Sequence, residues 1–195
     1  MTTFVAFPKI ARLNREIVIT EKLDGTNAQV EINDAGDEIV SAGSRNRYIT
    51  PEMDNHGFAR WVRDNRDELI KLGPGRHYGE WWGNGIQHGY GLGKGDKRFS
   101  LFNVSRWEDP ATRPACCGVV PVLYRGPFSE AAIVEAVERL RTEGSVAAPG
   151  WMRPEGIIVY HTAAGTLFKV TLEKDAAPKS SYDAAHAARI AAEAA

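Results

Sequence analysis

The stretch Glu21-Lys22-Leu23-Asp24-Gly25-Thr26-Asn27 stands between two apolar runs, and the rest of the chain is organised around it. Residues 17–20 before it are β-branched and apolar, whereas residues 28–32 after it alternate apolar with polar side chains. Both patterns are typical of β-strands. The sequence therefore predicts that Lys22 lies at the junction of two strands.

The composition is that of an ordinary globular protein. The chain has 195 residues, 43% hydrophobic and 25% charged, and no apolar run approaches the roughly 18 residues of a membrane span. Lys9 and Arg12 follow the short apolar start, which is unlike a secretory signal, so we expect a cytoplasmic protein with no membrane partner. The net charge of −1 means that any polyanion must meet a local basic patch. Cys116 and Cys117 are adjacent and are interpreted as reduced thiols.

Hydrophobic periodicity and turn residues predict the remaining elements. Further strands are expected over 38–42, 77–82, 99–104, 119–124, 156–161 and 166–171. Helices are expected over 58–70 with Asp54 as cap, over 129–141, and at the alanine-rich end over 182–195. Because strands outnumber helices, we predict an α+β fold with antiparallel sheets flanked by helices on their outer faces.

Two predicted loops connect strands of this fold. A turn at 34–37 predicts a meander that brings Lys22 near the loop carrying Arg45 and Arg47. The glycine-rich loop 83–95 does not open a helix, so it is not interpreted as a phosphate-binding P-loop.

Four further fragments have ordinary structural explanations when each is taken alone. Gly79-Glu80 fits a strand end, Phe102 a core aromatic, Glu155-Gly156 a turn and Phe168-Lys169 a strand. Each of them, however, lies beside an apolar strand, and they follow Lys22 in one order. Their combination is far more specific than any single fragment.

In that order the fragments resemble the motifs of covalent nucleotidyltransferases, the superfamily of ATP-dependent DNA and RNA ligases and mRNA-capping guanylyltransferases. The likeness is greatest to phage RNA ligases of the second, duplex-nick-sealing type, and it covers residues 7–174. The matching motifs are Lys22-Leu23-Asp24-Gly25-Thr26-Asn27 (I), Ser44-Arg45 (Ia), Gly79-Glu80 (III), Phe102 (IIIa), Glu155-Gly156 (IV) and Phe168-Lys169 (V).

The resemblance implies a nucleotidyltransferase fold, the ATP-grasp-like adenylation fold of ligases. It implies one minimal domain over residues 1–195 without the C-terminal accessory domain that relatives carry. A monomer is expected, in the host cytoplasm if a phage encodes it.

The chemistry implied by the resemblance is attack of the Lys22 amine on the α-phosphate of ATP, which leaves a lysyl-AMP phosphoramidate and releases pyrophosphate. A lysine with a pKa near ~10.4 needs desolvation or a cationic neighbour to attack, and Lys169 is the candidate neighbour. Asp24, Glu80 and Glu155 are the implied holders of Mg²⁺ or Mn²⁺, through water. Asp24, Glu155 and Lys169 are thus expected to be catalytic together with Lys22.

The resemblance also implies contacts to nucleotide and RNA. Phe102 is expected to stack on adenine, Glu21 to contact the purine edge and Glu80 the ribose. Arg45 is expected to contact the nucleotide phosphate or the RNA end. Asn27 is expected to act in sealing, after AMP has passed to a 5′-phosphate that a 3′-hydroxyl then attacks. The implied partner is RNA with these ends, as a nicked duplex, and its expected contacts are Asn27, Arg45, Arg47 and Lys97.

The chain departs from the family pattern at two positions. Thr171 stands where motif V usually has a second basic residue, and Asn103 stands where an aspartate usually follows the motif IIIa aromatic. Two alternatives therefore stay open beside an RNA ligase. One is a minimal DNA ligase or guanylyltransferase, and the other is a non-catalytic module that binds nucleotides or nucleic-acid ends.

Overall fold

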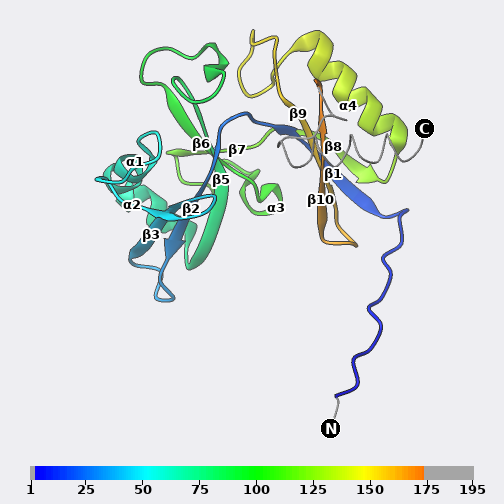
Figure 1. Cartoon of the computed structure of the whole chain (residues 1–195), viewed down its shortest axis with the longest axis horizontal. Coiled ribbons are helices and arrows are strands. Elements are labelled where there is room, and N and C mark those ends of the chain that lie inside the picture. Colours follow the sequence, from blue (N-terminus) through cyan, green and yellow to red (C-terminus); the bar gives the residue numbers. More distant parts are fainter. Residues whose placement is uncertain (1–2, 174–195) are drawn as a thin grey trace, which may run out of the picture.

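A computed structural model describes residues 3–173, which form two β-sheets with short helices on their outer faces (Figure 1). The strands are β1 (Glu16–Lys22), β2 (Thr26–Ile32), β3 (Ile39–Ser44), β4 (Tyr48–Ile49), β5 (Gly75–Gly83), β6 (Lys97–Leu101), β7 (Cys117–Val119), β8 (Val122–Pro127), β9 (Gly156–His161) and β10 (Thr166–Thr171). The helices are α1 (Phe58–Asp64), α2 (Arg66–Leu69), α3 (Val104–Trp107) and α4 (Glu130–Glu143), with 3-10 turns at Ile70–Leu72 and Gly89–Gly91. The helix expected over 182–195 lies outside the described residues.

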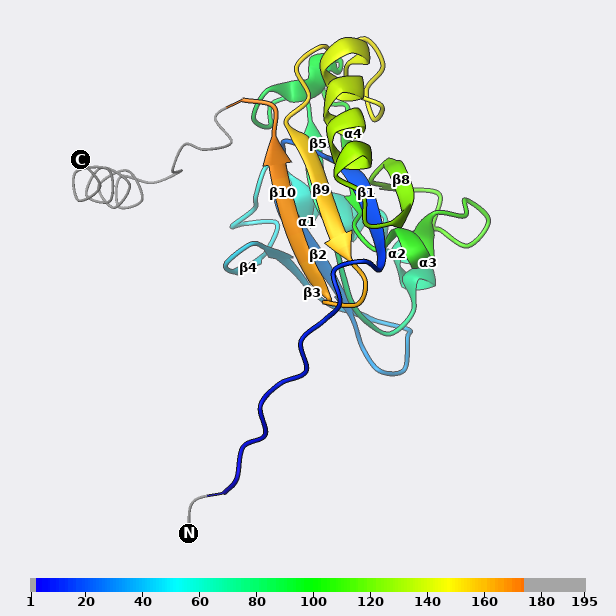
Figure 2. The ribbon, with the colours of Figure 1, turned by 90° about the vertical axis from the view of Figure 1, so that its right-hand side faces the viewer.

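The four-stranded sheet has the order β10-β9-β1-β8, and all its pairings are antiparallel. Helix α4 covers one of its faces (Figure 2). The side chains of Ile17 and Ile19 point to that helix and form a buried cluster with Leu140 and Ile157. Because side chains alternate along a strand, Val18, Thr20 and Lys22 point to the other face, which we call the open face of this sheet.

The six-stranded sheet has the order β4-β3-β2-β5-β6-β7, and only the β6–β7 pair is parallel. Helices α1 and α2 cover one face through a large core that contains Val30, Phe58, Trp81 and Phe99. The opposite, open face carries Asn27 and Glu80, which are directly paired across β2 and β5.

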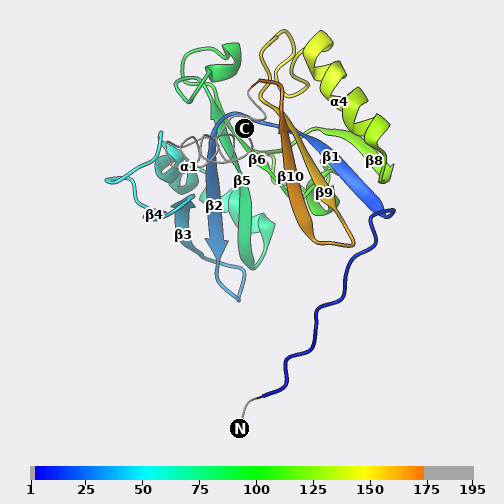
Figure 3. The same ribbon diagram turned by 45° about the vertical axis from the view of Figure 1, so that its right-hand side comes forward.

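The two sheets lie side by side and are joined by the segment 23–25 between β1 and β2 (Figure 3). A third buried cluster connects their open faces, with Val18 from one sheet, Trp82 from the other, and Leu23 and Tyr90 between them. Lys22 therefore lies at the junction of two strands, as predicted, and these strands belong to different sheets.

The α+β class, the hairpin of β9 and β10 and the helix after Ser129 are confirmed. The single helix predicted over 58–70 is wrong, because it is interrupted at Asn65, whose side-chain amide donates to the carbonyl oxygen of Trp61 at 2.8 Å. The N-cap residue of α1 is Gly57 and not Asp54 as predicted, although the Asp54 carboxylate accepts the backbone N–H of Ala59 in the first turn at 2.8 Å.

Two predicted strands also end differently. The strand over 99–104 ends at Leu101, because Asn103 begins a helix by accepting the backbone N–H of Arg106. The strand over 119–124 is divided between the two sheets at Pro121, which has no N–H to continue a ladder. Within residues 3–173 no helix is both long and apolar enough to span a membrane.

Candidate active site

Lys22 is the last residue of β1, and its amine forms an ion pair with the carboxylate of Glu155. The β-ladder makes this contact, because Lys22 pairs directly with Gly156 at the start of β9. Both side chains are about one-fifth exposed, 20% for Lys22 and 19% for Glu155, so a ligand can reach them. Motifs I and IV are thus in contact.

Lys169 lies on the same open face as Lys22, two strands away. Lys169 pairs with Ile158, which pairs with Thr20, and Thr20 lies two residues before Lys22 on the same side of β1. Two strand spacings place the backbones about 10 Å apart across the sheet. The exposed Lys169 amine can therefore reach the same ligand as Lys22, while Thr171 lies in the row of Lys22 itself.

Glu80 connects the six-stranded sheet to the lysine segment. Its carboxylate accepts the backbone N–H of Gly25 at 3.1 Å and the side-chain amide of Asn27 at 2.9 Å. Burial raises the pKa of Glu80 to about 7, while the Asn27 hydrogen bond and the Lys22 charge oppose the shift. The segment 23–25 packs tightly against β5 at Gly25, where a Cβ atom would lie 2.5 Å from the Trp81 carbonyl oxygen.

Glu21 faces away from Lys22 and is 1% exposed. Its carboxylate accepts hydrogen bonds from the Ser145 hydroxyl at 2.5 Å and from the backbone N–H groups of Val146 and Ala147 at 2.9 and 3.0 Å. Burial raises its pKa, and these three bonds oppose the shift. Glu21 therefore holds the loop after α4, and its predicted contact to a purine edge stays a prediction.

The glycine-rich loop supplies two contacts that the sequence did not predict. His88 contacts the carboxylate of Asp24, and the Tyr90 hydroxyl accepts the backbone N–H of Asp24 at 2.8 Å. Burial also raises the pKa of Tyr90, which keeps this hydroxyl neutral. In the sequence, the high density of glycines was the signal that this loop packs closely against other segments of the protein.

A shallow concavity on the open face of the six-stranded sheet brings together three other predicted residues. It is lined by Asn27, Arg45 and Phe102, together with Ala28, Gln29, Ser44 and Tyr78. Phe102 is 41% exposed, which leaves its ring accessible for stacking.

Arg47 and Lys97 make local contacts instead. The Arg47 guanidinium donates to the carbonyl oxygens of Met53 and Asp54 at 3.1 and 3.4 Å, and the Lys97 amine donates to that of His56 at 2.6 Å. Both side chains hold the loop before α1. Their predicted contacts to RNA stay predictions.

The three carboxylates expected near a metal each already accept a hydrogen bond or ion pair from the protein. Across residues 3–173 no group of three or more His, Cys, Asp or Glu side chains is arranged to ligate a metal ion. Their chemistry nevertheless suits a hard cation, because Mg²⁺ and Mn²⁺ prefer oxygen ligands and Mg²⁺ keeps several of its waters.

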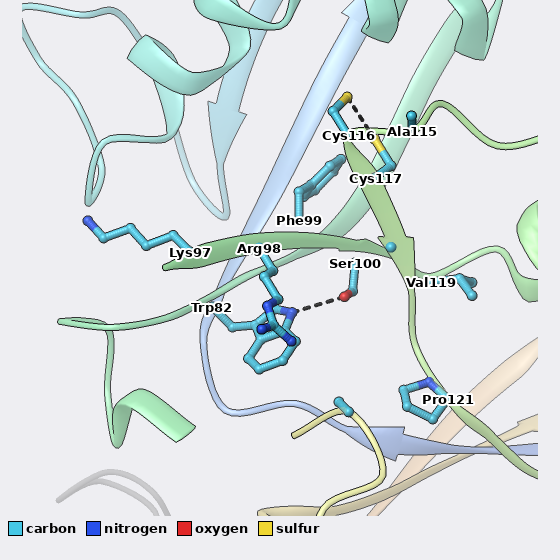
Figure 4. Close-up of a pocket in the computed structure, with 12 residues that line it drawn as sticks. Trp82, Lys97, Arg98, Phe99, Ser100, Ala115, Cys116, Cys117, Val119 and Pro121 are labelled. Carbon is cyan, nitrogen blue, oxygen red and sulfur yellow. Dashed lines mark hydrogen bonds between the residues drawn. The ribbon is translucent and has the colours of Figure 1, made fainter. Parts of the chain in front are cut away.

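A larger cavity of about 320 Å³ lies beside β6 and β7 (Figure 4). The Trp82 indole N–H donates to the Ser100 hydroxyl at 2.9 Å on its wall, and the Cys116 and Cys117 sulfur atoms are 3.8 Å apart. Of the predicted site residues only Lys97 lines this cavity. The vicinal thiols are free, as the sequence predicted.

The site thus lies where two sheets meet at a strand-end lysine, with one glutamate contributed from each sheet. A sequence model of the family described as RNA ligase matches residues 15–171. The chain belongs to the RNA ligase family. No curated protein matches the sequence.

Solved structures of Naegleria gruberi RNA ligase share the fold. An apo variant has 21% identity and a TM-score of 0.55, and the match covers 82% of this chain and 50% of that chain. A variant with ATP and Mn has 20% identity and a TM-score of 0.57, with 85% and 52% covered. The complex with PPi has 20% identity and a TM-score of 0.57, with 88% and 57% covered. The chain thus spans little more than half the length of these structures.

Proposed function

We propose that the chain is an ATP-dependent RNA ligase that forms a lysyl-AMP intermediate at Lys22. The observation that carries this proposal is the contact of motifs I and IV, in which the Lys22 amine meets Glu155 at the junction of the sheets. Family membership and the fold shared with ligase structures that contain ATP and Mn or PPi support it.

In the proposed first step, the Lys22 nitrogen attacks the α-phosphorus of ATP, the bond to the bridging oxygen breaks, and pyrophosphate leaves. Glu155 contacts the amine and is placed to accept its proton. Lys169, on the same open face, would neutralise charge that develops on the phosphate oxygens. Phe102 would stack on the adenine, as its exposed ring permits.

Asp24, Glu80 and Glu155 would hold the waters of a divalent cation, which would supply further charge neutralisation at the phosphates. Because each carboxylate keeps a protein partner, a water-mediated contact would leave the hydrogen bonds of Gly25 and Asn27 in place. Outer-sphere binding is therefore the arrangement that we propose.

Transfer of AMP to a 5′-phosphate and its displacement by a 3′-hydroxyl would follow. Arg45 lies at the rim of the concavity beside Asn27, where an RNA phosphate can approach it. The resemblance favours a nicked duplex as substrate and a cytoplasmic monomer as the working form, and both belong to the proposal.

Incubation with ATP labelled at the α-phosphate and Mg²⁺ tests the first step. We expect an acid-labile covalent adduct with the wild type and none with Lys22→Ala. Lys71→Ala is the matched control, since Lys71 also pairs with a glutamate, Glu68, but on the helical face of the six-stranded sheet. Absence of an adduct from the wild type would show that the chain is not a nucleotidyltransferase.

The same preparations distinguish the remaining alternatives, two enzymatic and one non-catalytic. Labelling by GTP in place of ATP would identify a guanylyltransferase, and sealing of nicks in DNA alone would identify a DNA ligase. RNA binding by Lys22→Ala together with an unlabelled wild type would identify a non-catalytic module.

A further inference from the structure

The open face of the six-stranded sheet carries a row of aromatic side chains. Tyr48 on β4 pairs with Gly43 on β3, and Gly43 pairs with Gln29 on β2. Gln29 pairs with Tyr78 on β5. Phe102 continues the row, because its backbone N–H donates to the Tyr78 carbonyl oxygen at 3.0 Å.

The three aromatic rings of this row project from one face. Directly paired residues of antiparallel strands have their side chains on the same side of the sheet. Along β5, Tyr78 also shares its side with Glu80, two residues further on, and not with Trp81, which lies in the core beneath α1. Tyr48, Tyr78 and Phe102, which we call the aromatic row, therefore share the open face with Glu80.

The rings of the aromatic row are accessible to solvent. Tyr48 is 57% exposed, Tyr78 52% and Phe102 41%. A single exposed aromatic residue is ordinary on a protein surface, but three in one row across a sheet offer several points of contact to one ligand strand. Gly43 lies between Tyr48 and Tyr78 and has no side chain to stand above the sheet. A Cβ atom at this position would lie 2.5 Å from the Gln29 side chain.

Positive charge lies along this surface. Arg45 is exposed at the rim of the concavity that Tyr78 and Phe102 line, and within residues 3–173 it makes no ion pair or hydrogen bond. On the other side, Arg76 pairs with Glu31 at 3.0 Å, and hydrogen bonds to Glu31 and then Tyr78 raise the pKa of this guanidinium. Glu31 neutralises Arg76, so Arg45 supplies the cation beside the flat rings, and surfaces for single-stranded nucleic acid combine rings with cations in this way.

We propose that the aromatic row is a stacking platform for unpaired bases of the RNA strand that is joined. This inference rests on the proposed function, in which Phe102 stacks on the adenine, and it assigns Tyr78 and Tyr48 to the RNA. The two tyrosines are three strand spacings apart, about 14 Å, so they contact different nucleotides.

The platform distinguishes unpaired from paired ends. Bases inside an RNA duplex are stacked on one another, and aromatic side chains reach only bases that are splayed out of a single strand, loop or end. The platform therefore offers contacts to unpaired terminal nucleotides that the bases of a fully paired nicked duplex cannot make. It is tolerant of sequence, because every base presents a flat face.

Equilibrium binding of a fluorescent single-stranded RNA with a 5′-phosphate tests the inference. We expect Tyr78→Ala and Tyr48→Ala each to weaken the Kd by roughly fivefold to hundredfold. Tyr78→Phe keeps the ring and should bind as the wild type does. Phe4→Ala, which removes an aromatic residue 88% exposed in the N-terminal segment, is the control and should bind unchanged.

Two further measurements make the result decisive. A fully paired nicked duplex should lose much less affinity in the alanine variants than the single strand does. Equal affinity of wild type and alanine variants for single-stranded RNA, or no binding by the wild type, would overturn the inference. Labelling of Lys22 by ATP without RNA should stay unchanged in Tyr48→Ala, because Tyr48 lies outside the concavity that Phe102 lines, so failure of the platform and failure of the proposed ligase chemistry are separately visible.

Discussion

We expect replacement of Glu80 by glutamine to change how the stability of the protein depends on pH. Glu80 is only 7% exposed, and burial raises its pKa from the ordinary 4.5 to about 7. Its oxygens accept the backbone N–H of Gly25 and the amide of Asn27. Glutamine keeps the shape and one acceptor but cannot ionise, so it isolates the cost of burying this charge.

The sign follows from proton binding. Between pH 4.5 and 7 the unfolded chain loses the Glu80 proton while the folded protein keeps it. The stabilising contribution is therefore complete below pH 4.5 and is lost as the pH rises through about 7. A shift of about 2.5 pH units corresponds to about 3 kcal/mol of the free energy of unfolding, at about 1.4 kcal/mol per unit.

Urea unfolding of wild type and Glu80→Gln from pH 5 to 8, with EDTA present, measures this difference. The other titrating groups, including Glu21 with its raised pKa, are present in both proteins, so their effects cancel in the comparison. Relative to the wild type, we expect the free energy of unfolding of Glu80→Gln to increase by up to about 3 kcal/mol between pH 5 and pH 8. Free energies of unfolding that stay parallel across this range would refute the reasoning that Glu80 is ionised at a cost.

Four other substitutions test the fold. Gly156→Ala would place a Cβ atom 2.1 Å from the Val170 carbonyl oxygen, so thermal unfolding should show a loss of several kcal/mol, at least about 4. Gly150→Ala, also at positive φ but with no atom within 4 Å, should cost only about 1 kcal/mol in the same measurement. Leu140→Ala removes a fully buried side chain of α4 and should lower the free energy of unfolding in urea by about 2–5 kcal/mol. Asp54→Ala removes the carboxylate that accepts the backbone N–H of Ala59 in the first turn of α1, so chemical denaturation should detect a loss of about 1 kcal/mol.

The sequence predicted those features that local pattern determines. The alternation after Asn27 identified β2, and the apolar run before Glu21 identified β1. The family resemblance implied that Lys22 and Glu155 share a site, and the pairing of β1 with β9 brings these two side chains into contact. A hydrophobic period of two or of 3.6 residues is visible within a short stretch of sequence, so these strands could be predicted.

Contacts between distant loops had no such pattern. Ser145, which binds Glu21, is 124 residues away from it, and His88, which contacts Asp24, is 64 residues away. Each lies in an irregular segment whose path depends on the packing of both sheets. The break at Pro121 was visible in the sequence, but the apolar residues around it outweighed its missing N–H in the prediction.

The division of the site between two sheets bears on how its steps can be separated. Adenylylation would draw on both sheets, since Lys22 and Lys169 stand on one while Glu80 stands on the other. The aromatic row belongs to the six-stranded sheet alone. Because Tyr48 lies on β4, outside the concavity that Phe102 lines, its ring can be removed without disturbing the hydrogen bonds that position Gly25. Loss of RNA affinity with Lys22 labelling intact is therefore the outcome that this architecture requires.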